Sequence, residues 1–165
     1  MCGLFFSKNI SLDPNQISKV KDLLKHRGPD YSNHHVYNDN IFLIHTRLSI
    51  QDLSINGNQP MIDNKNEVTI VYNGEIYNHI NLRNELLSKF NINFRGSSDT
   101  ETILHLYLHY KYDFISKLKG IFSFCIYDQR DQSIFVVRDQ FGVKPLYYFS
   151  DNNRYVFCSE IKPII

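Results

Sequence analysis

The chain of 165 residues contains seven short apolar runs, and several are continuous where a half-exposed strand would alternate polar and apolar residues. Successive side chains of a strand point to opposite faces of a sheet, so a continuous apolar run needs cover on both faces. We therefore predict buried strands enclosed by other layers. The predicted strands are Gly3–Phe6, Ile41–Leu48, Val68–Tyr72, Ile121–Tyr127, Ile134–Val137, Leu146–Phe149 and Tyr155–Cys158.

Three segments between these runs have the features of helices. Asp13-Pro14-Asn15-Gln16 combines an N-cap residue, a proline suited to the first turn and a glutamine that completes a capping box, and Gly28-Pro29 ends this helix. A second helix is predicted from about Asn78 to Phe90, and a third from the capping-box pattern Ser98-Asp99-Thr100-Glu101 to about Tyr112. The apolar stripe expected on the second helix consists of Ile80, Leu82, Leu86 and Leu87. Helices interspersed among strands favour an α+β fold with sheets flanked by helices.

The composition excludes several classes of function. There are 18 Lys and Arg against 17 Asp and Glu, a net charge of +1, so we expect no nucleic-acid partner. No run approaches the ~18–20 apolar residues of a membrane helix, so we expect no membrane partner. The three cysteines, Cys2, Cys125 and Cys158, form no Cys-x-x-Cys pair, which argues against a zinc site or a disulfide framework. The expected location is the reducing cytoplasm.

Cys2 follows the initiator methionine directly and precedes Gly3. A small second residue normally allows Met1 to be removed, which would leave Cys2 with both a thiol and a free α-amine. That amine titrates near ~7.7–8.0, so it is a usable general base at neutral pH. An amine that activates the side chain of its own residue is a known way to make a nucleophile. Taken alone, a cysteine near a chain end is more often without function. Whether Cys2 is a nucleophile therefore depends on the other motifs in the chain.

Three further positions offer side chains that amide hydrolysis needs. Asn73-Gly74 follows the predicted strand Val68–Tyr72, where it is first of all a turn signal, yet its amide and its glycine N–H suit an oxyanion. Arg47 ends an apolar run. It is either an ion-pair partner within the protein or a residue whose planar guanidinium binds a substrate carboxylate. Asp99, in the first turn of a predicted helix, either complements the helix dipole or holds a substrate ammonium. An arginine and an acid together would recognise a free amino acid.

These residues belong to a series of motifs that runs through the chain: Met1-Cys2-Gly3, His26-Arg27-Gly28-Pro29-Asp30, Arg47-Leu48-Ser49-Ile50, Tyr72-Asn73-Gly74-Glu75-Ile76-Tyr77-Asn78, Ser98-Asp99-Thr100-Glu101, Gly120-Ile121-Phe122-Ser123-Phe124, Arg138-Asp139, Gly142-Val143-Lys144-Pro145-Leu146-Tyr147-Tyr148 and Ser159-Glu160-Ile161-Lys162. In this order they closely resemble the glutaminase domain of glutamine-hydrolysing asparagine synthetases. That domain is a class II glutamine amidotransferase of the N-terminal-nucleophile hydrolases. The resemblance covers residues 1–165.

The resemblance implies a four-layer αββα sandwich, with two stacked, mainly antiparallel sheets between helices. It implies that Cys2 is the nucleophile, that Asn73 and Gly74 form the oxyanion hole and that Arg27 supports the nucleophile. The implied substrate-binding positions are Arg47, Leu48, Ser49, Ile50, Gln51, Asn73, Gly74, Glu75 and Asp99.

The implied reaction is hydrolysis of the side-chain amide of L-glutamine to glutamate and ammonia through a Cys2 thioester. The resemblance implies no cofactor or metal for this domain. ATP and magnesium belong to an ATP-dependent synthetase domain that uses the ammonia to make asparagine; we expect that domain in a longer chain or as a partner. The resemblance also admits a homodimer.

Two alternatives stay open. The same glutaminase domain would equally feed amidation of another carboxylate, such as a sugar acid. A degenerate domain would act as a regulatory module without catalysis, although the joint presence of Cys2, Arg47, Asn73, Gly74 and Asp99 argues against it.

Two other polar patterns are interpreted as structural. Arg138-Asp139 is expected to form an ion pair at a turn. His105 and His109 are four residues apart on a predicted helix, a spacing that can bind a metal, but we expect them on a solvated face.

Overall fold

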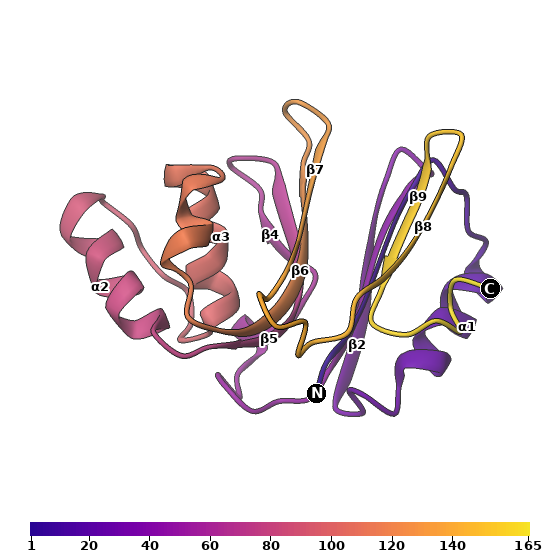
Figure 1. The fold of residues 1–165 in the computed structure, drawn as a ribbon, viewed down its shortest axis with the longest axis horizontal. Coiled ribbons are helices and arrows are strands. Elements are labelled where there is room, and N and C mark those ends of the chain that lie inside the picture. The colour runs from indigo at the N-terminus through magenta and orange to yellow at the C-terminus, as the bar shows by residue number, and fades with distance from the viewer.

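The computed structural model describes residues 1–165 as a sandwich of four layers (Figure 1). Two sheets face each other in the middle of the molecule. Helix α1 (Pro14–Leu24) covers the outer face of one sheet, and α3 (Asp99–Tyr110) covers that of the other, with α2 (His79–Lys89) packed against α3. The predicted αββα architecture is confirmed.

Both sheets are antiparallel throughout. The first has the spatial order β2-β3-β1-β9-β8 and consists of β1 (Gly3–Lys8), β2 (Tyr31–Tyr37), β3 (Ile41–Arg47), β8 (Tyr147–Asp151) and β9 (Arg154–Cys158). The second has the order β4-β5-β6-β7 and consists of β4 (Met61–Asp63), β5 (Val68–Ile76), β6 (Gly120–Asp128) and β7 (Ser133–Arg138). Two short 3₁₀ helices are η1 (Ile55–Gly57) and η2 (Asp113–Lys117).

Strand β3 shows why a continuous apolar run is buried in this fold, since all of its residues are buried. Ile41 and Leu43 face the other sheet and pack in a cluster with Val71. Phe42 and Ile44 point the opposite way, into the cluster that α1 covers. Each face of the strand is thus covered by a different layer, as the sequence pattern predicts.

The strand predictions differ from the structure at three places. Strands β2 and β4 were not predicted, because they lie at sheet edges and lack a long apolar run. Strand β5 does not end at Tyr72 but continues to Ile76, so the predicted Asn73-Gly74 turn is wrong. Strand β6 pairs with β5 at both positions, with Ser123 opposite Asn73 and Phe122 opposite Gly74. This pairing overrides the local preference of Asn-Gly for a turn.

The capping signals give the right helix starts. At α1, the Gln16 N–H donates to Asp13 Oδ1 and the Asp13 N–H donates to Gln16 Oε1, each at 2.9 Å. At α3, Ser98 Oγ accepts from the Glu101 N–H at 3.3 Å, but the Glu101 carboxylate bonds elsewhere, so only half of the predicted box forms. Helix α3 ends at Tyr110, two residues earlier than predicted.

The predicted apolar stripe of α2 is only half right. Leu82 and Leu86 are buried against the core of the second sheet and α3, whereas Ile80 and Leu87 are about half exposed. Helix α2 packs along one narrow line, so only residues four apart on that line are covered.

Of the two histidines of α3, His109 is exposed as predicted and His105 is partly buried, and both contact aromatic rings. His109 stacks on Phe90 with ring centroids 4.0 Å apart, and His105 meets Phe94 edge-on at 4.8 Å. No group of side chains in the structure is arranged to hold a metal ion. Cys125 and Cys158 are buried free thiols.

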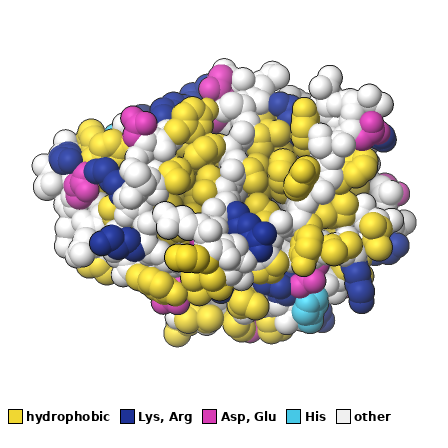
Figure 2. Space-filling view, in the orientation of Figure 1, with side chains coloured by type: hydrophobic (Ala, Val, Ile, Leu, Met, Phe, Trp, Pro, Cys, Tyr) yellow, Lys and Arg dark blue, Asp and Glu magenta, His cyan; other side chains and the backbone are white.

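The surface view agrees with the small net charge. Figure 2 shows Lys and Arg side chains in separate small groups among Asp, Glu and neutral side chains on the face in view. The longest helix, α3, has 12 residues, and none is both long and apolar enough to cross a bilayer.

Candidate active site

A small pocket of about 100 Å³ lies where the start of β1, the ends of β3 and β5 and the N-terminus of α3 come together. Gly3 pairs with Thr46 across β1 and β3, so the antiparallel register places Cys2 opposite Arg47. Strand β5 of the other sheet brings its Asn-Gly-Glu segment to the same place. The predicted site residues that line the pocket are Cys2, Arg47, Leu48, Ile50, Gln51, Asn73, Gly74, Glu75 and Asp99.

Two predicted residues do not line the pocket. The structure turns the Ser49 backbone N–H to Asp30 Oδ2, at 2.7 Å. Arg27 lies behind Cys2: its Nε donates to the Cys2 carbonyl oxygen at 3.0 Å, and its Nη1 pairs with Glu160 Oε1 at 2.6 Å. Arg27 is buried and holds the backbone of the cysteine, which is a supporting position.

The Cys2 side chain is half-buried, and its thiol lies 3.7 Å from the Leu48 carbonyl oxygen. Burial raises the pKa of the Cys2 thiol above its usual value, and the nearby Asp99 charge adds to this, while the Arg47 charge opposes it. The thiol is therefore protonated at neutral pH in this environment and needs a base to become a nucleophile. Met1 is the residue before it and also lines the pocket.

Asn73 is 1% exposed, and its side-chain Nδ2 has no hydrogen-bond partner. A buried amide donor without a partner is costly, by roughly 1–3 kcal/mol, so such a group needs an explanation. The next residue must be glycine, because a Cβ at Gly74 would lie 2.4 Å from the Ile121 carbonyl oxygen. The site thus holds an unused N–H₂ donor beside a backbone that only glycine fits.

Arg47 is almost completely buried, and its guanidinium is bound to the loop that follows. Its Nη1 donates to Ser54 O at 2.9 Å and to Asn58 Oδ1 at 2.6 Å. Its Nη2 donates to the carbonyl oxygens of Gln51, at 3.3 Å, and Asp52. These contacts use all four N–H groups of the two terminal nitrogens, so the charge and the Nε–H remain for a ligand.

Asp99 is 4% exposed and has no cationic partner. Its Oδ2 accepts from the Tyr72 hydroxyl at 2.6 Å and from the Ile76 N–H at 3.0 Å. Burial raises the pKa of the Asp99 carboxyl, although these hydrogen bonds oppose the rise. Burial and the Asp99 charge also raise the pKa of Tyr72, so its hydroxyl stays a donor.

Residues without an assigned role in the sequence analysis also shape the site. Gln59 is buried and joins β5 to α3, since its Oε1 accepts from the Tyr72 N–H at 2.6 Å and its Nε2 donates to Thr100 Oγ1 at 3.2 Å. Lys144 lines the pocket and is 9% exposed. Glu160 pairs with Arg27. Lys144 and Glu160 both lie within motifs that carry the resemblance. The motifs alone do not predict which residues these two side chains contact.

The predicted Arg138–Asp139 ion pair is wrong. Arg138 donates instead to the carbonyl oxygens of Lys144, at 2.7 Å, and Gly142, at 2.6 Å. The Asp139 carboxylate accepts from four backbone N–H groups, including that of Lys144 at 3.0 Å and that of Phe122 at 3.3 Å. Each side chain shapes the 139–144 turn independently, and the turn brings Lys144 to the pocket.

Two antiparallel sheets lie between helices, and a cysteine at the start of an inner strand shares a pocket with the buried, unpartnered amide of Asn73. Comparison with known families is more specific: the chain belongs to the family described as "Glutamine amidotransferase domain", which matches residues 1–165.

Individual relatives agree with this membership. The chain is 41% identical over 149 residues to "Asparagine synthetase [glutamine-hydrolyzing] 1" of Bacillus subtilis, covering 90% of this chain and 23% of the relative. It is 43% identical over 151 residues to "Amidase chyE" of Penicillium rubens, covering 92% and 22%. The solved glutamine phosphoribosylpyrophosphate amidotransferase of B. subtilis has the same fold, with a TM-score of 0.79 at 20% identity, covering 99% of this chain and 43% of that one. The chain spans a quarter or less of the two curated relatives' length.

Proposed function

We propose that this chain hydrolyses the side-chain amide of L-glutamine to glutamate and ammonia, with Cys2 as the nucleophile. The observation that carries the proposal is the buried, unpartnered Nδ2 of Asn73 in the same pocket as the Cys2 thiol. An amide carbon attacked by a thiolate develops an oxyanion, and a preorganised N–H donor stabilises it. The family membership and the glutamine-hydrolysing relative support glutamine as the substrate.

The proposed base is the α-amine of Cys2, set free by removal of Met1. While Met1 is attached, the Cys2 nitrogen is an amide and accepts no proton, and Met1 occupies part of the pocket wall. Removal therefore creates the base and enlarges the pocket at once. Because burial keeps the thiol protonated, an adjacent amine with a pKa of ~7.7–8.0 is suited to take its proton.

In the proposed sequence, the thiol proton passes to the amine, and the thiolate sulfur bonds to the amide carbon. Asn73 Nδ2 and the Gly74 N–H hold the oxyanion. The ammonium then gives its proton to the leaving nitrogen, the carbon–nitrogen bond breaks, and ammonia departs from a γ-glutamyl thioester. Water, deprotonated by the amine, attacks the thioester, and collapse returns the proton to sulfur and releases glutamate.

The charged residues of the pocket fit the rest of an amino acid. Asp99, a buried carboxylate without a cation, is proposed to take the α-ammonium, with Glu75 beside it. Arg47 is proposed to attract the α-carboxylate through its charge and its Nε–H. Leu48, Ile50 and Gln51 form the adjacent wall.

We further propose that the ammonia serves an ATP-dependent synthetase domain that makes asparagine, in a longer chain or as a partner. The similarity to the asparagine synthetase of B. subtilis supports this acceptor. ATP and magnesium would belong to that second domain. A working thiol favours the reducing cytoplasm as the location.

The test is a glutaminase assay combined with N-terminal mass measurement. The processed chain should release ammonia and glutamate, and Cys2→Ala should retain less than a few per cent of the rate. A glutamine analogue with an electrophilic carbon in place of the amide should add to Cys2 and to no other cysteine; Cys125 and Cys158, both buried, are internal controls. An active preparation that retains Met1 would contradict the proposed base.

A further inference from the structure

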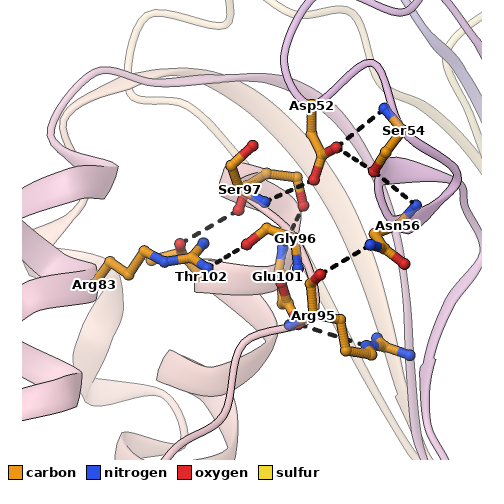
Figure 3. Close-up of polar contacts among 10 residues, drawn as sticks. Asp52, Ser54, Asn56, Arg83, Arg95, Gly96, Ser97, Glu101 and Thr102 are labelled. Atoms are coloured by element: carbon orange, nitrogen blue, oxygen red, sulfur yellow. Dashed lines mark hydrogen bonds and ion pairs between the residues drawn. The ribbon is translucent and has the colours of Figure 1, made fainter.

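The loop 51–58, which Arg47 holds, faces the turn 95–97 just before α3 (Figure 3). The two segments are more than 35 residues apart in the sequence, and two side chains of the loop, those of Asp52 and Asn56, form hydrogen bonds between them. They meet beside the pocket, because one follows Arg47 and the other precedes Asp99.

The first contact comes from Asp52. Its Oδ2 accepts from the Ser97 N–H at 2.6 Å, while its Oδ1 accepts from the N–H and the hydroxyl of Ser54, at 3.1 and 2.5 Å. One carboxylate oxygen thus shapes the loop, and the other joins the loop to the turn before α3. Asp52 also adopts a φ of +49°, a left-handed conformation that aspartate tolerates better than most residues.

The second contact comes from Asn56, whose Nδ2 donates to the Arg95 carbonyl oxygen at 2.8 Å. The turn itself is held from behind by Glu101, a buried residue of α3 that accepts from the N–H groups of Arg95, at 2.8 Å, and Gly96, at 3.0 Å. Arg83 of α2 donates to the Gly96 carbonyl oxygen (Figure 3). The turn is therefore held by hydrogen bonds to α2 and α3 on the side opposite the loop.

The fit between the two segments is close. A Cβ on Gly96 would lie 2.2 Å from Asp52 Oδ2 and 2.9 Å from Asn56 Cβ, so any larger residue would push the loop away.

We propose that Asp52 is a positioning residue for glutamine binding, which sets the separation between Arg47 and Asp99. Its backbone carbonyl accepts from Arg47 Nη2, and its side chain binds the N–H two residues before Asp99. These two residues are the proposed partners of the α-carboxylate and the α-ammonium, so the inference rests on the proposed function. Asp52 itself does not line the pocket.

The charge state supports this role. Burial alone would raise the pKa of the Asp52 carboxyl, but the hydrogen bonds from Ser54 and Ser97 outweigh it and lower the pKa. The carboxylate is therefore ionised at neutral pH, and a charged acceptor holds the Ser97 N–H more strongly than a neutral one.

Asp52→Asn tests the link selectively. The asparagine oxygen can keep the contact to Ser54, whereas its N–H₂ group then faces the Ser97 N–H, donor against donor. The KM for glutamine should rise about tenfold to a hundredfold, with kcat changed by less than about twofold, because the amino-acid end of the substrate is bound equally in the ground and transition states. Asp131→Asn is the matched control: Asp131 Oδ1 binds the Ser133 N–H at the remote β6–β7 turn, and KM should not change.

Gly96→Ala disturbs the contact between Asp52 and the turn 95–97 by a change in the turn. It tests the role of Asp52 if Asp52→Asn does not fold. It should raise KM in the same way, and the double variant should be no worse than the more severe single one, since both break one contact. A KM within about twofold of wild type in the folded variants, or a fall in kcat at constant KM, would overturn the proposal.

The Kd of glutamine, measured by calorimetry in a Cys2→Ala background, separates this inference from the proposed function. Asp52→Asn should raise that Kd by the same factor as KM. A wild-type chain that binds glutamine without hydrolysing it would refute the proposed function and leave the Kd comparison as the test of Asp52. A Kd unchanged by Asp52→Asn in a hydrolytically competent protein would refute the role of Asp52 alone.

Discussion

Asp99 and Asp128 lie at opposite ends of α3, and both are almost completely buried. Asp128, at the end of β6, accepts from Arg130 Nε and Nη2 at 2.7 and 2.6 Å, from Lys111 Nζ at 2.9 Å and from the Tyr107 hydroxyl at 3.1 Å. Although burial opposes it, these contacts lower the pKa of the Asp128 carboxyl strongly. Asp99 forms no ion pair, and burial raises the pKa of its carboxyl, although hydrogen bonds and nearby His79 oppose the rise.

This is the difference expected between a structural carboxylate, Asp128, and the carboxylate proposed to bind the substrate, Asp99. The chain supplies the cations that Asp128 needs, so burying this charge stabilises the fold. At the pocket it supplies hydrogen bonds but no cation to Asp99, and it leaves the Asn73 amide unpartnered. Groups that are incompletely satisfied in the free protein gather where a ligand with an ammonium and an amide would complete them.

The largest effect is expected for Asn73→Ala. Loss of one oxyanion donor typically slows the chemical step by ~10²–10³, or ~2.7–4 kcal/mol. Because Asn73 Nδ2 forms no hydrogen bond within the protein, the thermal unfolding temperature should change little. Steady-state kinetics and calorimetric melting would measure both. A variant that hydrolyses glutamine as fast as wild type would contradict the proposed role of Asn73 in the oxyanion hole.

Acid should destabilise the protein through His45, a third buried titratable group. Its Nε2 lies 3.0 Å from the Tyr72 carbonyl oxygen of the other sheet, its Nδ1 has no partner, and burial lowers its pKa to about 4. The unfolded state takes up a proton near pH 6.5, so the stability that neutral His45 contributes is complete above that pH. It falls by about 3 kcal/mol as the pH drops to 4.

Urea unfolding at a series of pH values would measure this loss, with His45→Gln as the comparison. The variant should have a flatter profile between pH 6.5 and 4 than the wild type. Parallel profiles would assign the acid sensitivity to other groups.

Asp99→Asn should raise the KM for glutamine about tenfold to a hundredfold, because the neutral amide no longer attracts an ammonium. The unfolding free energy should stay within about 1 kcal/mol of wild type, since no ion pair is lost and the asparagine oxygen can keep the hydrogen bonds from Tyr72 and Ile76. Kinetics and urea unfolding on one preparation would show both. A strongly destabilised variant with normal KM would make Asp99 structural, like Asp128.

Asp128→Asn should give the opposite pattern, with glutamine kinetics unchanged and stability reduced by about 2 kcal/mol. The estimate is modest because Arg130 and Lys111 are partly exposed and screened by water. Urea unfolding beside the glutaminase assay would measure it. Should Asp128→Asn impair glutamine binding instead, the contrast between the two aspartates would fail.

Much of the fold follows from local patterns. The continuous apolar runs required cover on both faces, and the capping residues Asp13 and Ser98 marked the helix starts, because both signals depend on short-range geometry. The edge strands β2 and β4 have no such signal. The course of β5 through Asn73 and Gly74 depended on its partner β6, which is distant in the sequence.

At the site, the motifs identified Cys2, Arg47, Asn73 and Asp99, and the structure brings all four to one pocket. Their contacts could not be foreseen. Arg47, for example, donates its terminal N–H groups to the loop that follows it, and no local pattern in the sequence predicts those partners.

Residue order alone established which chemical groups this protein possesses: a thiol beside a latent amine, an amide next to a glycine, an arginine and an acid. It also indicated strands covered on both faces, since continuous apolar runs and capping residues are properties of neighbouring residues. Folding decided which of those groups have partners. Whether a buried carboxylate meets a cation, as Asp128 does, or none, as Asp99 does, depends on side chains that only the packed sheets and helices bring within hydrogen-bonding distance.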